Sequence, residues 1–149
     1  PNPEWTPFIS QGVAEEFISF VTEDETRRHL GQVYPSNAVF MLRELIETRP
    51  EIAQHLADAF VKTLGYIQSH TAEELAAYIP QPIRSKYGKD YIEVLKAQVP
   101  MFRGNGLMSG EAAAGESASF GLLNEAYRAV PPELTYNNSF VSRALKSLT

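Results

Sequence analysis

Apolar residues recur at helical spacing through much of this chain, and the pattern is clearest in its middle. After Pro50, large apolar side chains return every three or four residues, at Ile52, Leu56, Phe60, Leu64 and Ile67. This spacing places them on one face of an α-helix. Proline is common in the first helical turn, where its missing N–H costs no hydrogen bond. The pattern therefore predicts an amphipathic helix from Pro50 to about Ser69.

The same spacing predicts further helices, bounded by capping and breaking residues. Thr71 and Glu74 have the separation of a capping box, which satisfies two free N–H groups at a helix start. Gly31, Pro80 and Pro131 are predicted to end helices. The other predicted helices are residues 10–22, 25–30, 42–48, 71–78, 89–98, 109–130 and 139–148. Residues 1–8 contain three prolines and are predicted to be extended or turning.

One short apolar run has the length of a buried strand rather than of a helix. Residues 38–42 read Ala-Val-Phe-Met-Leu and follow the turn-forming residues 34–37. A lone strand cannot satisfy its backbone groups, so it needs a partner. That partner would come from the weaker strand candidate at residues 134–136, from a second copy, or from residues before Pro1. The fold class predicted is therefore α/β and helix-rich.

Composition narrows the functional classes. The chain has 149 residues, 44% of them apolar, and a formal net charge of −5, which fits a single globular unit spanning residues 1–149. Its 13 Lys and Arg residues are scattered and form no basic stripe, which argues against nucleic-acid binding. No apolar run approaches the roughly 20 residues of a membrane span. The absence of cysteine excludes disulfides and cysteine-ligated zinc.

No catalytic, metal or cofactor site is predicted. His29, His55 and His70 lack the spacing and companions of a metal-ligand set. The neighbouring acids in Glu15-Glu16 and Glu73-Glu74 point apart on a helix, so neither pair forms an acid/base dyad. Nucleophile and phosphate-loop motifs are absent from the sequence. The chain is therefore not expected to be an enzyme.

Several segments occur in an order that resembles one known family. They are Trp5-Thr6-Pro7-Phe8, the stretch 34–40, the helix–proline–helix stretch 44–51, the Gly-Leu-Met loop within 101–109, and Tyr136-Asn137-Asn138-Ser139-Phe140-Val141. Together they resemble the C-terminal portion of the substrate-binding proteins of ABC importers for nitrate, sulfonates, taurine and thiamine precursors. The resemblance spans nearly the whole chain, but no single motif is highly specific.

The resemblance implies a fold, a function and a location. The fold would be part of a type II periplasmic-binding-protein fold, in which residues 1–32 end the second lobe and residues 33–149 return to the first through a crossover strand. The function would be capture of a small solute by hinge closure, with no catalysis. A membrane permease would recognise the closed form. The location would be the periplasm or a membrane-tethered extracytoplasmic position.

The resemblance also implies ligand contacts, at Trp5, Thr6, Tyr34 and Asn37. Each has an ordinary alternative: Trp5 could anchor a turn by packing, and Tyr34 and Asn37 are common turn residues. Thr6 stands where the family often has glutamate, which removes a carboxylate from the cleft wall. A threonine hydroxyl can instead donate a hydrogen bond to an anionic oxygen.

Two expectations concern what the chain needs from outside itself. It begins without methionine and would supply only one wall of a cleft, so it is expected to be a portion of a larger protein that binds solute weakly alone. Its exposed apolar surface is expected to be covered by a second copy or by an N-terminal piece.

Two other functions stay open. The first is a self-contained, mainly helical protein-interaction domain. A paired strand at residues 39–42 would favour transport, and a helix running from Ala38 through Thr48 would favour interaction. The second is a thiamine-pyrimidine biosynthesis enzyme of related fold, which would need a reacting histidine outside this chain.

Overall fold

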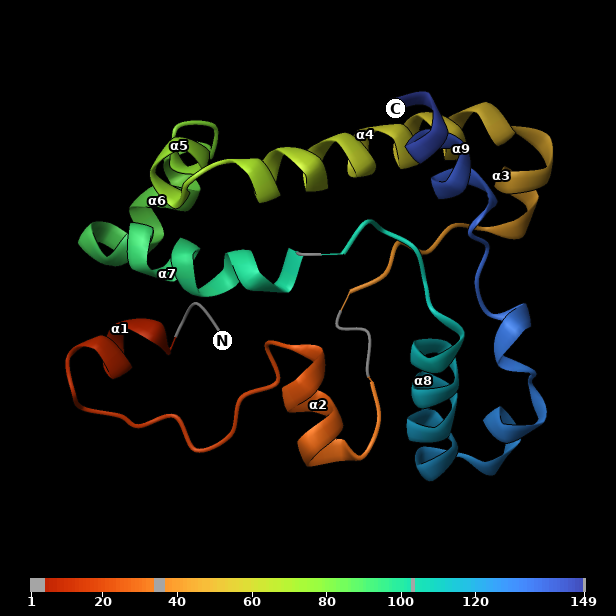
Figure 1. The fold of residues 1–149 in the computed structure, drawn as a ribbon, viewed down its shortest axis with the longest axis horizontal. Helices are drawn as coiled ribbons and strands as arrows, with labels where there is room; N and C mark the ends of the chain where they lie inside the picture. The colour runs from red at the N-terminus through yellow and green to blue at the C-terminus, as the bar shows by residue number, and fades with distance from the viewer. Residues whose placement is uncertain (1–4, 34–36, 103, 149) are drawn as a thin grey trace.

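A computed structural model describes residues 5–33, 37–102 and 104–148, without the side chains of Thr6, Pro7 and Lys89. Every regular element in these ranges is helical (Figure 1). The α-helices are α1 (Thr6–Ser10), α2 (Glu23–Leu30), α3 (Arg43–Thr48), α4 (Pro50–Ser69), α5 (Ala72–Ala76), α6 (Gln81–Tyr87), α7 (Tyr91–Gln98), α8 (Gly110–Leu123) and α9 (Ser139–Leu148). The 3₁₀ turns are η1 (Gly88–Asp90), η2 (Val99–Phe102), η3 (Glu125–Ala129) and η4 (Pro132–Leu134).

The prediction of an α/β fold is wrong for the part of the chain that the structure describes. Residues 38–42 belong to no strand or helix, and Phe40 is 86% exposed rather than buried. The second strand candidate is also absent, since Leu134 ends η4. An extended segment forms a sheet only where another strand takes up its backbone hydrogen bonds, and no described segment does so. The partial periplasmic-binding-protein architecture with its crossover strand is therefore not observed.

The predicted helix starts are largely confirmed. Helix α4 begins at Pro50 and runs to Ser69. Arg49, the residue before it, has φ −137° and ψ 56°, a non-helical conformation that separates α3 from α4. Thr71 and Glu74 form the predicted capping box at the start of α5. The Ser109 side chain accepts a hydrogen bond from the Ala112 N–H and opens α8. These local signals act within one helical turn, which explains why the sequence alone reveals them.

Other helix predictions are wrong or incomplete. The helix predicted over residues 10–22 is absent: α1 ends at Ser10, and Gly12 turns the chain with a φ of 71°. Phe17 and Val13 in this stretch are 93% and 68% exposed, so much of its apolar face lacks the packing that would stabilise a helix. The helix predicted over residues 109–130 stops at Leu123, where Asn124 adopts an extended conformation and caps η3. Helix α6 was not predicted, because Pro82 lies in its first turn instead of ending a helix.

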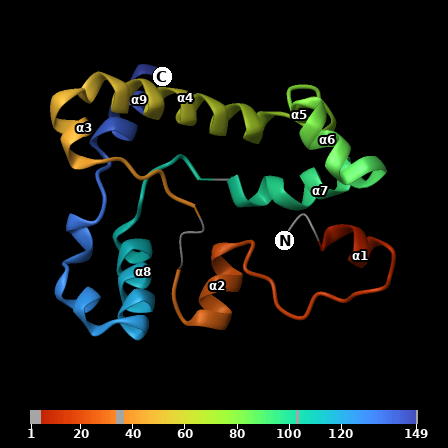
Figure 2. The same cartoon turned by 180° about the vertical axis from the view of Figure 1, so that it is seen from behind.

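The helices form two connected groups. Helix α4 packs against α3 and α9 at one end, and α7 runs below it in Figure 1, connected through α5 and η2. Helix α8 packs with η3 and η4 and lies beside α2 in both views (Figures 1 and 2). The Asn138 side chain joins the groups, since it donates to the Met108 carbonyl at 2.8 Å and accepts from the Met108 N–H at 3.0 Å.

The core is small and built mainly from short side chains. Most of its residues are alanine or valine: Val33, Ala53, Ala57, Val61, Ala72, Leu75, Ala76, Tyr91, Val94, Ala112, Ala113 and Ala144. Many larger apolar residues remain on the surface, among them Phe17, Phe40 and Leu122. The fold therefore leaves extensive apolar surface open to other molecules.

The approach of Val33 to α8 yields a stability prediction. Alanine normally stabilises a helix relative to glycine, by about 1 kcal/mol. At Gly115, however, an added Cβ would overlap the Val33 carbonyl oxygen. We expect Gly115→Ala to lower the free energy of unfolding by about 1–3 kcal/mol, measured by urea unfolding.

Gly65 in α4 is the matched control. An added Cβ at Gly65 meets nothing within 4 Å, so Gly65→Ala should raise the free energy of unfolding by about 0.5–1 kcal/mol. Equal stabilisation by both substitutions would show that α8 does not approach Val33 so closely in solution.

Candidate functional site

The structure places Trp5 at the turn that opens α1. Its carbonyl accepts hydrogen bonds from the N–H groups of Phe8 at 3.0 Å and Ile9 at 3.2 Å. Its ring lies 6.3 Å from the ring of Phe8, centre to centre, and the residue is 60% exposed. Trp5 thus packs on its own turn and still exposes more than half of its surface to solvent. Thr6 begins α1, and its side chain lies outside the description.

The other two predicted ligand residues lie elsewhere. Tyr34 falls outside the described residues, and Asn37 is exposed at the start of the extended segment that leads to α3. Helix α1 packs against α7, on the opposite side of the molecule from α3 (Figure 1). The structure therefore does not bring Trp5 and Asn37 together.

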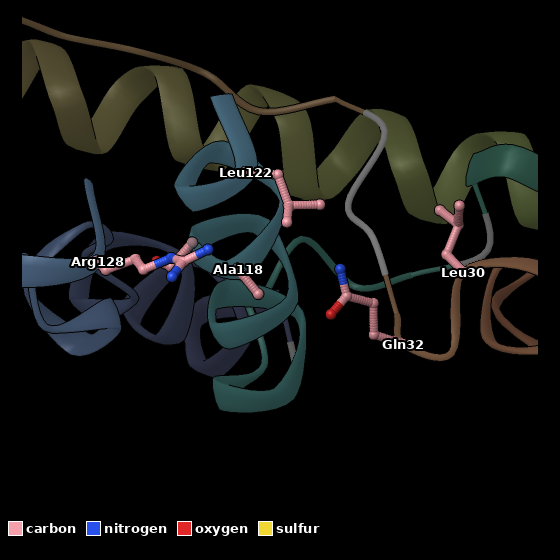
Figure 3. A pocket seen from close by; sticks show the side chains of 6 residues that line it. Leu30, Gln32, Ala118, Leu122 and Arg128 are labelled. Carbon is pink, nitrogen blue, oxygen red and sulfur yellow. The ribbon is translucent and has the colours of Figure 1, made fainter. Parts of the chain in front are cut away.

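One hollow lies between the end of α2, α8 and η3, with a volume of about 490 Å³ (Figure 3). Leu30, Gln32, Ala118, Leu122 and Arg128 line it. The Gln32 amide is already hydrogen-bonded to α8, because it donates to the Gly115 carbonyl and to the Ser119 hydroxyl, both at 2.9 Å. Leu122 is 81% exposed, so the hollow is open to solvent. It offers a ligand one cation, Arg128, and little enclosure.

A larger cavity lies between α4, α5, α7 and η2, with a volume of about 590 Å³. Its walls are mostly apolar and are formed by Ile67, Leu75, Ile79, Leu95, Val99 and Phe102. Both its volume and its apolar lining fall within the range of small-molecule sites. Leu75 in its wall is buried, whereas Leu122 in the wall of the hollow beside α8 is 81% exposed, which makes this cavity the stronger candidate for a binding site.

Two tyrosines line this cavity, Tyr66 from α4 and Tyr78 from the turn that follows α5. The Tyr66 ring contacts the Tyr78 ring edge to face, at 5.4 Å between centres and an angle of 82°. A hydrogen bond with the Tyr78 side chain is the main cause that raises the pKa of Tyr66 to about 12, with burial and the Tyr78 and Glu74 charges adding to it. On its other side Tyr66 stacks on His70 at 3.6 Å. The Tyr66 phenol is therefore held in place and remains neutral at physiological pH.

Polar groups at the edge of the cavity come from α4 and α7. Lys62 lies one helical turn before Tyr66, and Gln98 ends α7. Among the described residues, neither the Lys62 ammonium nor the Gln98 amide has a side-chain partner. Thr63 is engaged, because its hydroxyl donates to the Ala59 carbonyl at 2.7 Å. A cation and an amide are thus available beside an apolar cavity.

The histidines do not form a site in this structure. The Nδ1 atom of His70 lies 2.8 Å from the Tyr66 carbonyl and 3.0 Å from the Ser69 hydroxyl, at the end of α4. His29 contacts the Phe20 ring edge to face. Within the described ranges, no three His, Asp or Glu side chains come close enough to hold a metal ion. None of the helices described there has the length and apolar character needed to cross a membrane.

Comparison with models of known protein families, with curated proteins and with solved structures finds no match to this chain.

The residues around the larger cavity were not singled out from the sequence. Lys62 and Tyr66 are four residues apart, a spacing that places them on one face of α4. Tyr78, however, reaches the same cavity only because the chain reverses at His70 and Thr71 between α4 and α5. The spacing within α4 was a usable signal, whereas the meeting of Tyr66 with Tyr78 depends on tertiary structure.

The tyrosine pair yields a spectroscopic prediction. Replacing Tyr78 with phenylalanine removes the hydrogen bond that raises the pKa of Tyr66. We expect the pKa of Tyr66 to fall from about 12 towards 10.0 in Tyr78→Phe, measured by NMR titration of the tyrosine ring carbons, with circular dichroism reporting folding at each pH.

Tyr127→Phe is the control, since Tyr127 contacts Phe120 rather than Tyr66, and it should leave the titration of Tyr66 unchanged. A Tyr66 pKa near 10.0 in the unaltered protein would mean that the two phenol groups are not hydrogen-bonded in solution.

Proposed function

We propose that this chain takes part in solute capture for an ABC importer of the nitrate, sulfonate, taurine and thiamine-precursor type, without catalysis. The supporting observation is the coincidence of helix boundaries with the segments that carry the resemblance. Helix α3 gives way to α4 at Arg49-Pro50, α8 follows the Gly-Leu-Met loop, and α9 follows Tyr136-Asn137-Asn138. The proposal depends on these helical segments and not on a crossover strand.

The proposed mechanism is binding coupled to movement. A solute that contacts two separated segments stabilises the arrangement that brings them together. Trp5 and Asn37 are both exposed and lie on different parts of the chain, so each is free to contact a solute. A permease in the membrane would then distinguish the solute-bound arrangement from the free one.

Binding of known solutes of this importer class tests the proposal. The product of the complete reading frame would be titrated with nitrate, with taurine and with a thiamine-precursor pyrimidine by isothermal calorimetry. We expect one of them to bind, and Trp5→Ala to weaken that binding by about tenfold, the effect of losing one aromatic contact.

Phe17→Ala is the matched control, because Phe17 is also a highly exposed aromatic residue of the N-terminal region. It should leave solute affinity unchanged. Failure of all three solutes to bind at millimolar concentration, or equal effects of Trp5→Ala and Phe17→Ala, would contradict the proposal.

A second candidate function is protein–protein interaction through a helical surface, and one observation favours it. The neighbouring residues Leu122 and Leu123, at the end of α8, are both 81% exposed. Phe120 and Tyr127, whose rings contact each other nearby, are also exposed. Clustered exposed apolar side chains of this kind are typical of protein interfaces. Residues 38–42 favour neither function, because they form neither a paired strand nor part of a continuous helix with α3.

Association in solution tests this second candidate. If the end of α8 is an interface between two copies, the protein should be a dimer by light scattering, and Leu122→Glu should shift it towards monomer because a buried charge is costly. Ile83→Glu, at an exposed apolar position of α6, should leave the dimer intact. A monomer at every concentration would contradict an interface between copies.

A further inference from the structure

We propose that the cavity between α4, α5, α7 and η2 binds an organic carboxylate, whose aromatic or aliphatic body lies between the helices and whose carboxylate faces Lys62. This goes beyond the proposed solute capture, because neither Trp5 nor Asn37 lines the cavity. The proposal rests on the volume and walls of the cavity, on its fixed tyrosine pair, and on the charge at its edge.

The walls of the cavity suit an apolar body of moderate size. Leu75 is buried, and Ile67, Ile79 and Leu95 are half-buried, so a ligand would complete their burial rather than displace them. A volume of about 590 Å³ exceeds what one apolar side chain fills and lies within the range of small-molecule pockets. Removal of this apolar surface from water supplies the driving force for binding.

Tyr66 gives the cavity an aromatic wall residue that two neighbouring rings contact. Tyr66 is fixed between His70 on one side and Tyr78 on the other. Little side-chain freedom is therefore lost when an aromatic ligand packs against Tyr66. The Tyr66 and Tyr78 phenols both line the cavity. A phenol O–H can donate a hydrogen bond, and a carboxylate oxygen is a strong acceptor.

The charges around the cavity favour an anion over a cation. Lys62 projects from the same face of α4 as Tyr66 and has no acidic partner among the described residues. The nearby acids are engaged elsewhere: Glu73 pairs with Lys96 at 3.0 Å, and Glu74 accepts a hydrogen bond from the Thr71 N–H at 2.8 Å. Both carboxyl groups have lowered pKa values, caused chiefly by backbone N–H donors. Lys62 is thus an exposed cation at the cavity edge with which no described side chain pairs.

The Gln98 amide is a second polar group at the cavity, and it lies on α7 rather than on α4. It comes from the end of α7, across the cavity from Lys62, and can donate or accept a hydrogen bond. The hollow beside α8 lacks this combination, since its amide is already bonded and its apolar residues are exposed. Of these two pockets, the larger one combines apolar walls, the Tyr66 ring and a cation with which no described side chain pairs.

A matched pair of probes tests the proposal. 4-Phenylbutanoate has the proposed apolar body and carboxylate, and 4-phenylbutanamide is a neutral molecule of nearly the same shape. We expect the unaltered protein to bind the acid more tightly than the amide in calorimetry. Lys62→Gln should weaken binding of the acid by about tenfold, as expected for loss of a charge-assisted contact, and should leave the amide unaffected.

Two further variants locate the binding site. Thr63→Phe would place a ring at the edge of the cavity and should weaken both probes, because it fills space that the ligand needs. Arg28→Gln removes a positive charge from α2, away from the cavity, and should change neither affinity. Circular dichroism would establish that each variant keeps its helix content.

Three results would overturn the proposal: no binding of either probe, equal affinity for the acid and the amide, or unchanged binding in Thr63→Phe. The third would place the probes on exposed apolar surface elsewhere. This test and the test of solute capture can fail independently. Trp5→Ala should weaken binding of the importer solute but should not affect binding of either phenylbutane probe.

Discussion

The contact between α4 and α9 is the interaction on which the rest of the structure depends. Ala53 and Ala57 on α4 are buried, and Ala144 on α9 is only 1% exposed, so short side chains let the two helices pack closely. Gln54 reinforces the contact, since it donates to the Phe140 carbonyl at 3.0 Å and accepts from Arg143 at 2.6 Å. Helix α3 attaches to the start of α4, and Asn138, just before α9, holds the start of α8. Loss of this contact would therefore release both helical groups.

A core of short side chains has a consequence for the surface. Each alanine buries little apolar area, and burial supplies about 25 cal/mol per Å² of stabilisation. Most phenylalanines, several leucines and the single tryptophan, which would normally supply much of this area, remain exposed. The same surface explains why each function considered for the chain involves another molecule. A solute, a second copy and an organic carboxylate would each cover apolar area that the chain does not cover itself.

The sequence predicted the helix boundaries that local interactions determine. It did not predict the features that depend on contacts between distant segments. Helix α4 and the Thr71–Glu74 capping box were predictable because their signals lie within a few residues. The strand at residues 38–42 was predicted from apolar content, yet strand formation requires a partner that no described segment provides. The absence of a helix over residues 10–22 has a related cause: an amphipathic pattern is stable as a helix only when something packs against its apolar face. The Tyr66–Tyr78 pair was unpredictable because it depends on the direction in which α5 leaves α4.

The two proposed ligand sites differ in what binding would do to the protein. The α4–α5–α7 cavity is bounded by helices, and Tyr66 is already fixed by its neighbours. A ligand there would stabilise the existing arrangement, and its effect would follow mass action on a single folded state. Trp5 and Asn37 lie on segments that the structure does not bring together. A solute that binds both must favour a different arrangement of these segments, and its affinity is reduced by the free energy of that rearrangement. Carboxylate binding should therefore leave the shape of the protein unchanged, whereas solute capture should be accompanied by a change in shape.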